Sequence, residues 1–200
     1  MVGPMSFVTR GFSGRRREPD PAVPPGQTLV EDWPVLSAGV TPEVSTDDWD
    51  FTIVTEHGRH MWTWEQLQAL GPEDVVVDIH CVTHWSKLQM PWRGVSLDRL
   101  FEEVETEHDY VMAHSVGGYT TNLPLDEVLD GQAWVAFEAE GEPLTPEHGG
   151  PARLLVPHLY FWKSAKWVRG LTTMASDEPG FWESAGYHMH GDPWTEERYW

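Results

Sequence analysis

The sequence predicts an α+β domain in which mixed β-sheets carry a few short helices. Short β-branched and aromatic runs outnumber the segments with helical spacing, and the two kinds do not alternate regularly as they do in a doubly wound sheet. The size agrees, because 200 residues with 40% apolar content and 12 Trp suit one hydrophobic core. We therefore expect one domain over residues 28–200.

An N-terminal arm is expected before this domain. Residues 1–27 are rich in Gly, Pro, Arg and Ser, so we expect a flexible segment, with order beginning near Leu29. Arg15–Arg17 are similar to a twin-arginine export signal, but Glu18–Pro21 follow where that signal needs apolar residues. No run approaches the roughly 18 apolar residues of a membrane span. A single Cys fits a reducing compartment, and we expect a cytoplasmic protein.

The elements of the domain follow from local patterns. Strands are predicted where β-branched or aromatic residues gather between turn signals, at 51–55, 75–81, 110–114, 133–138, 153–156 and 165–174. Thr63 stands at capping-box spacing before Gln66 and predicts a helix that continues to Leu70. Helical turns are also predicted over 97–104 and 124–129. The strand 75–81 places Cys81 at a strand terminus.

The charge of the chain excludes one class of partner. It has 32 Asp and Glu against 13 Lys and Arg, and a formal net charge of −19. Such a charge repels a phosphate backbone and an anionic membrane face. We therefore expect no nucleic-acid partner.

The segment around Cys81 has groups that favour thiolate chemistry. Its sequence HCVTHWSK (80–87) places His80, His84 and Lys87 near the thiol. These neighbours suit a nucleophile or a soft metal ligand. A zinc site normally has more ligands at recognisable spacing, and on a strand His80 would face away from Cys81. A buried structural cysteine stays open as the alternative.

A cationic segment stands out in this acidic chain. Between His148 and Ser176 there is no Asp or Glu, while four cations are present: Arg153, Lys163, Lys166 and Arg169. Lys163 to Lys166 (KSAK) offers ammonium groups and a hydroxyl, which suits a bound anion such as phosphate. The preceding Gly149, Gly150 and Pro151 predict a tight turn where backbone approaches a ligand. The alternative is that these cations pair with surface carboxylates.

The C-terminal segment 180–194 is rich in Gly, His and aromatic residues. We expect its aromatic side chains to form a lid over the core. His188 and His190 have the spacing of a metal-binding pair, but a His-x-His pair in a loop is more often solvated or hydrogen-bonded. We expect that state here.

Four segments in order resemble the oxidoreductase molybdopterin-binding domain of sulfite oxidases and of small bacterial methionine-sulfoxide-reducing enzymes. They are HCVTHWSKL (80–88) with WRGV (92–95), the middle segment 110–125, HGGPARLLVPHLYFWKSAKWVRGL (148–171) and GFWESAGYHMHGDPW (180–194). The match covers about Trp33 to Trp194. Each segment is weak alone, but the ordered set is specific.

The resemblance implies a sulfite-oxidase-type fold and a molybdenum–molybdopterin cofactor. It assigns the metal to the Cys81 thiolate, with His84 beside it as a candidate catalytic residue. It assigns the remaining cofactor contacts to Ser115 or Val116, His148, Arg153, Ser164, Ala165 and Lys166. The pterin's terminal phosphate agrees with the anion site that the charges indicate. His148 stands where the family often has Asn, and His84 where close relatives prefer Arg, so the substrate stays open.

The expected function is therefore a molybdenum-dependent oxidoreductase. The resemblance implies two-electron oxygen-atom transfer to or from a small-molecule substrate, with electrons exchanged through a separate partner. We expect no haem, because the sequence has no haem-binding segment. Two alternatives stay open: a molybdopterin-binding module without turnover, and an interaction domain in which Cys81 is structural.

Overall fold

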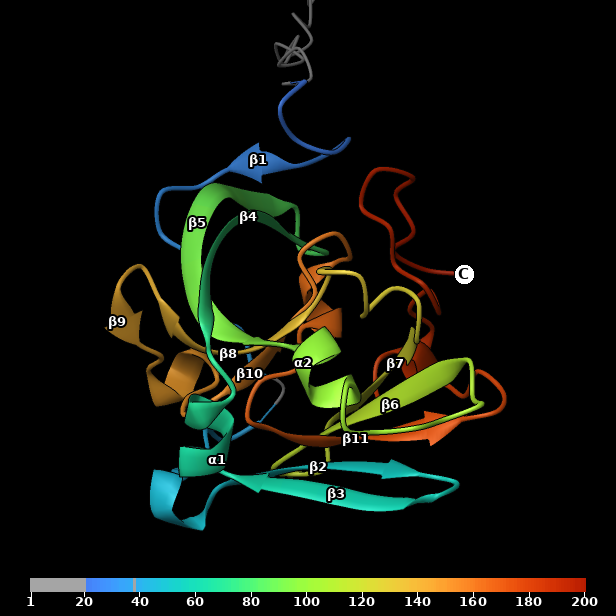
Figure 1. Ribbon diagram of the computed structural model, residues 1–200. Helices are drawn as coiled ribbons and strands as arrows, with labels where there is room; N and C mark the ends of the chain where they lie inside the picture. Colours follow the sequence, from blue (N-terminus) through green and yellow to red (C-terminus); the bar gives the residue numbers. More distant parts are fainter. Residues whose placement is uncertain (1–20, 38) are drawn as a thin grey trace, which may run out of the picture.

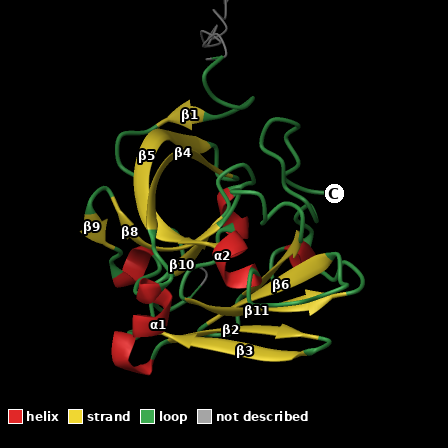
Figure 2. Cartoon of the chain, viewed as in Figure 1, coloured by secondary structure: helices red, strands yellow, loops and turns green. Residues whose placement is uncertain are grey.

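The protein is built from two mixed β-sheets, seen in a computed structural model that describes residues 21–37 and 39–200 (Figures 1 and 2). The strands are β1 (Thr28–Leu29), β2 (Asp50–Thr55), β3 (Gly58–Thr63), β4 (Glu73–Cys81), β5 (Trp85–Ser96), β6 (Tyr110–Ser115), β7 (Thr120–Pro124), β8 (Trp134–Ala139), β9 (Glu142–Pro143), β10 (Arg153–Leu155) and β11 (Val168–Met174). Within this described part, one sheet has the order β1-β5-β8-β10, with β4 on β5 and β9 on β8. The other has the order β3-β2-β11-β6-β7.

Both sheets are mixed, as predicted. The pairs β1–β5 and β2–β11 are parallel, and the other pairs are antiparallel. The six predicted strands lie in β2, β4, β6, β8, β10 and β11. Sequence patterns missed β5, the partner of β4, because Pro91 and Gly94 stand inside it and both residues are uncommon in strand interiors.

The helices are short. They are α1 (Trp64–Ala69), α2 (Leu97–Phe101) and the 3-10 turns Thr46–Asp48, Pro146–His148, Phe161–Lys163 and Glu183–Ala185. The predicted capping box is confirmed: Gln66 N donates to Thr63 Oγ1, and Thr63 N donates to Gln66 Oε1. The helical turn predicted over 124–129 is present as two overlapping hydrogen-bonded turns, in which Glu127 N donates to Pro124 O at 3.3 Å and Val128 N donates to Leu125 O at 3.2 Å. Pro124 ends β7, and Leu125 N donates across to Asp109 O, which continues the strand pairing.

Buried side chains form two clusters. The first holds residues from both sheets, including Phe51, Val111 and Leu154. The second lies along the β4–β5 hairpin, which curves strongly in Figure 1, and includes Cys81 and Met90. Since β4 ends within this second cluster, Cys81 lies at the end of a strand that is packed into the hydrophobic core.

The N-terminal segment packs earlier than expected. Val23 is buried, Gln27 Nε2 donates to Cys81 O at 3.0 Å, and Thr28 N donates to His84 O at 2.9 Å. A flexible arm extending to residue 27 therefore does not match residues 21–27, whose partners lie far along the chain. Residues 1–20 lie outside the described part. Among the described residues, no helix has the length and apolar character needed to cross a membrane.

Candidate active site

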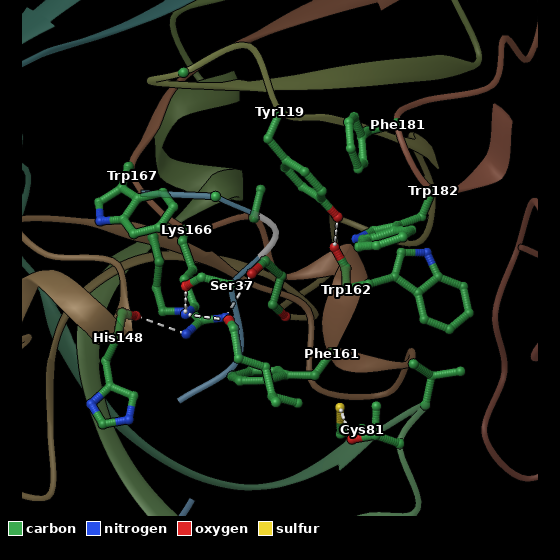
Figure 3. Close-up of a pocket in the computed structure, with 18 of the residues that line it drawn as sticks. Ser37, Cys81, Tyr119, His148, Phe161, Trp162, Lys166, Trp167, Phe181 and Trp182 are labelled. Atoms are coloured by element: carbon green, nitrogen blue, oxygen red, sulfur yellow. Dashed lines mark hydrogen bonds between the residues drawn. The ribbon is translucent and has the colours of Figure 1, made fainter. Parts of the chain in front are cut away.

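A pocket of about 530 Å³ brings together segments from across the chain. Its wall comes from residues 33–37 and 39–42, the turn after β4, the loop 116–119, the stretch 148–167 and the aromatic tail. Figure 3 shows Cys81 on one side of the pocket and Lys166 and His148 on the other, with Phe161 between them. The thiol and the cationic segment that the sequence singled out therefore face one cavity.

Cys81 lies where β4 turns into β5. His84 N donates to Cys81 O at 3.0 Å and closes the turn, and the thiol lies 3.1 Å from Thr83 Oγ1. Burial raises the pKa of the Cys81 thiol, while the hydrogen bond from Thr83 and the charges of Arg198 and Arg153 act in the opposite direction. A soft metal ion that binds the sulfur would take the place of its proton.

His80 points away from the pocket, as strand alternation predicts. Its Nδ1 lies 2.8 Å from Ser86 Oγ, and its ring meets Trp194 edge-on. Desolvation by burial lowers the pKa of His80, which favours the neutral imidazole. This side chain therefore packs behind the cysteine and does not line the cavity.

Arg153 is a buried cation that lacks an anion among the described residues. It is 1% exposed, and its Nη1 and Nη2 donate to His148 O at 2.8 Å and to Ser164 O at 2.7 Å. Its guanidinium lies 4.1 Å from the ring centre of Phe161. Burial lowers the pKa of Arg153 to about 9. Buried charges are normally paired, so this arrangement fits a pocket that receives an anionic ligand.

Lys166 adds a second cation to the same side. Its ammonium donates to Leu36 O at 2.7 Å, Glu147 O at 2.6 Å and Ser37 Oγ at 3.2 Å. Burial, and next the charge of Arg153, lower the pKa of Lys166 to about 8. Gly149 permits this packing: its φ is 103°, and a Cβ there would lie 2.9 Å from Lys166 Cβ. The predicted tight turn therefore packs directly against the Lys166 side chain.

Most of the cofactor contacts expected from the resemblance line the pocket. These are Cys81, Val116, His148, Arg153, Ser164, Ala165 and Lys166. The Ser164 hydroxyl accepts a hydrogen bond from Val156 N at 2.9 Å. Ser115 lies outside the lining, at the end of β6, and its buried Oγ has no hydrogen-bond partner among the described residues.

His84 does not line the pocket either. It is exposed, with a left-handed φ of 71°, and its Nδ1 lies 3.0 Å from Gly26 O. The turn that follows Cys81 carries this imidazole outward, toward the N-terminal segment. The expected catalytic role of His84 therefore does not match its position.

Two of the four predicted cations serve the fold instead. Lys163 is fully buried, forms an ion pair with Glu183 at 2.7 Å and donates to Asn122. Arg169 pairs with Asp50 on β2. Pairing with surface carboxylates was the alternative interpretation of the segment. It holds for Arg169, whose partner Asp50 is partly exposed, whereas Lys163 pairs with a buried carboxylate. The anion site is therefore limited to Arg153 and Lys166.

Aromatic residues that the charge pattern did not reveal complete the wall. Trp33 stacks on His148 with ring centres 3.9 Å apart, and Tyr119 donates its hydroxyl hydrogen to Trp162 O at 2.6 Å. From the tail, Phe181, Trp182 and Tyr187 line the pocket. These tail side chains thus cover the cavity as well as the core. The abundance of Trp was a signal for such a wall, but nothing local marked Trp33.

The two tail histidines are hydrogen-bonded, as expected. His190 lies 2.7 Å from Glu197 Oε2 and 3.2 Å from Glu127 Oε1, and His190 N donates to His188 Nδ1. No group of three or more metal-ligating side chains (His, Cys, Asp or Glu) is found among the described residues. These histidines therefore hold the tail in place.

Comparison with known proteins identifies the family. A model of the oxidoreductase molybdopterin binding domain matches residues 38–182. The chain belongs to this family. The chain is 42% identical over 195 residues to the uncharacterized oxidoreductase YuiH of Bacillus subtilis (strain 168). The alignment covers 94% of this chain and 98% of YuiH. The family relationship predicted from the four segments is thereby confirmed.

Two further relatives of this molybdopterin-binding domain are longer proteins. It is 29% identical over 135 residues to the putative protein-methionine-sulfoxide reductase subunit YedZ1 of Azospira oryzae, covering 66% of this chain and 51% of YedZ1. It is 25% identical over 190 residues to the catalytic subunit MsrP of Ralstonia nicotianae, covering 86% of this chain and 53% of MsrP. The chain therefore spans about half the length of these two reductases.

A solved structure confirms the fold of the molybdopterin-binding domain. The sulfane dehydrogenase SoxCD of Paracoccus pantotrophus superimposes with a TM-score of 0.60 at 22% identity, over 86% of this chain and 56% of that one. The fold of mixed sheets and short helices described above is therefore shared with this solved structure. The protein thus belongs to the molybdopterin oxidoreductase family by its sequence, and the solved structure shows the same fold.

Proposed function

We propose that this domain holds one molybdopterin, with molybdenum on Cys81, and transfers an oxygen atom to or from a small-molecule substrate in a two-electron reaction. One observation carries the proposal. The same pocket contains the thiol and a buried guanidinium whose described hydrogen-bond acceptors are all neutral carbonyls. A ligand with a soft metal at one end and an anionic group at the other satisfies both features.

The residues of the chain have distinct tasks in this proposal. Cys81 is the protein ligand to the metal, and Arg153 and Lys166 bind the anionic end of the pterin. The aromatic wall of Trp33, Phe161 and Trp162 excludes water along the cavity. When bound, the cofactor supplies a metal that exchanges two electrons and one oxygen atom with the substrate.

Two parts of the proposal concern what lies outside the chain. A separate electron-transfer partner restores the oxidation state of the enzyme after each turnover. The names of two relatives, both methionine-sulfoxide reductases, make a sulfoxide the first substrate class to assay.

Metal content provides the direct test. Protein purified from a host that synthesises molybdopterin should contain about one molybdenum atom per chain, measured by elemental analysis together with pterin content. Zinc in place of molybdenum, or no metal, would contradict the proposal and favour a structural Cys81. Molybdenum without turnover of sulfoxides or dyes would contradict the oxygen-transfer step and favour a non-catalytic cofactor-binding module.

A further inference from the structure

The turn that carries Cys81 is held from outside the pocket by two distant parts of the chain. On the N-terminal side, Gln27 Nε2 donates to Cys81 O at 3.0 Å, and Gly26 O lies 3.0 Å from His84 Nδ1. On the C-terminal side, Arg198 Nη1 donates to Val82 O at 2.9 Å. Consecutive carbonyl groups of the turn are therefore fixed by side chains that come from opposite ends of the described chain.

Arg198 joins these two supports. Its Nη2 donates to Pro25 O at 3.2 Å while its Nη1 holds Val82 O. The side chain is 93% buried, since its exposed fraction is 7%, and its guanidinium lies 4.9 Å from the ring centre of Tyr160. Both hydrogen bonds end on neutral carbonyls, so the positive charge is not used in an ion pair there. A planar guanidinium is suited to such a bridge because its N–H groups point in fixed, divergent directions.

The tail places Arg198 by contacts that do not involve the turn. Glu197 accepts a hydrogen bond from Asp192 N at 2.9 Å and lies 2.7 Å from His190 Nδ1. His188 N donates to Arg198 O at 3.2 Å. The tail is therefore folded on itself and on the domain, and the guanidinium extends from it toward the cysteine turn.

We propose that Arg198 is a positioning residue for the metal ligand, which fixes the Val82–Thr83 peptide and with it the turn that carries Cys81. This role rests on the proposed function, because it presupposes molybdenum on Cys81. Val82 follows the ligand directly and lines the pocket, so movement of its carbonyl would rotate the Cys81 side chain relative to the metal. Groups that orient a metal ligand typically matter almost as much as the ligand itself.

Arg198 is separate from the cations that bind the cofactor in the proposed function. Arg153 is placed to bind the anionic end of the cofactor, whereas the hydrogen bonds of Arg198 end on Val82 O in the turn and Pro25 O in the N-terminal segment. The task of Arg198 is therefore to hold the turn in place.

The test compares molybdopterin-loaded full-length protein with its Arg198→Met, Arg198→Lys and Glu197→Gln variants. Molybdenum content, the visible sulfur-to-molybdenum absorption band and the electron paramagnetic resonance spectrum of Mo(V) are recorded for each. Arg198→Met should change the band and the resonance spectrum, and should speed cofactor loss on dialysis by about 10- to 100-fold. Arg198→Lys keeps the charge but cannot bridge both carbonyls, so its spectra should also depart from wild type.

The control separates positioning from general docking of the tail. Glu197 does not contact the turn, and Gln keeps a side-chain oxygen that can accept from Asp192 N and so preserve the placement of Arg198; Glu197→Gln should therefore keep the wild-type spectra. Wild-type spectra in Arg198→Lys, or the same spectral change in Glu197→Gln, would overturn the role of Arg198 while leaving the proposed function intact. Arg198→Lys decides the matter if Arg198→Met does not fold. Wild-type protein without molybdenum would overturn the proposed function and this role together.

Discussion

Replacing Arg153 with Met should separate cofactor retention from protein stability. Met keeps much of the aliphatic length but removes the charge. Burial lowers the pKa of Arg153 from 12.5 to about 9. At 1.36 kcal/mol for each pH unit, this corresponds to about 5 kcal/mol against the charged form. The substitution also removes the donors to His148 O and Ser164 O, at a cost of about 1–3 kcal/mol for each buried carbonyl.

These opposing effects nearly cancel in the cofactor-free protein. We expect the free energy of unfolding to lie between about 3 kcal/mol above and about 1 kcal/mol below that of wild type. In the loaded protein the same change removes a charge-assisted hydrogen bond to the anionic end of the cofactor. Its loss of about 1.5–3 kcal/mol corresponds to roughly 10- to 150-fold weaker retention.

Two measurements check this expectation. Molybdenum and pterin per chain are determined after dialysis of protein from a molybdopterin-producing host, and urea unfolding is followed for protein from a host without molybdopterin. Arg169→Met is the matched control, because Arg169 lies in the same segment but pairs with Asp50 outside the pocket. Full cofactor retention in Arg153→Met, or equal loss in Arg169→Met, would refute the assignment of Arg153.

Three further outcomes are expected. Cys81→Ser should fold and lose the visible sulfur-to-molybdenum band; an unchanged spectrum with a lower thermal midpoint would contradict ligation. Glu183→Gln leaves the Lys163 ammonium buried without its carboxylate and should lower the free energy of unfolding by about 3–5 kcal/mol in urea titrations, whereas a change below about 1 kcal/mol would show that the pair is dispensable. The pKa of His190 is raised from 6.5 by its carboxylate partners, which outweigh burial. The contribution of the protonated His190 to the free energy of unfolding is complete below about pH 6.5 and is lost as the pH rises through the higher folded pKa. The thermal midpoint of wild type should therefore fall more steeply than that of His190→Gln between about pH 6 and 9. Parallel profiles of the two proteins would contradict this prediction.

Elements that depend on interactions between residues close in sequence were predicted correctly from local sequence patterns. The strand that ends at Cys81 and the helix that begins at Thr63 follow from β-branched spacing and a capping box, and both are present. The ordered motifs identified the family, and most of the expected contacts line one pocket. The pocket itself was predictable because a run without carboxylates is conspicuous in a chain of net charge −19.

Features set by distant partners were not predictable from sequence. Trp33 joins the wall by stacking on His148, across 115 positions of the chain. Lys163 turns inward because Glu183 is buried beside it, and no local signal distinguishes it from Lys166. His84 leaves the pocket because the turn requires a left-handed residue there. In each case a long-range pairing or a backbone constraint overrode the pattern.

The bridge made by Arg198 has a consequence for the order of events during biosynthesis. Arg198 lies 116 positions after Val82, so on a ribosome that adds about 5–20 residues each second it arrives roughly 6 to 23 s later. A nascent chain that already displays its thiol and Arg153 would still lack the support behind the cysteine. If Arg198 has the proposed role, a pterin that enters before residue 198 is synthesised meets a ligand turn without this support, and truncated products keep that turn unsupported.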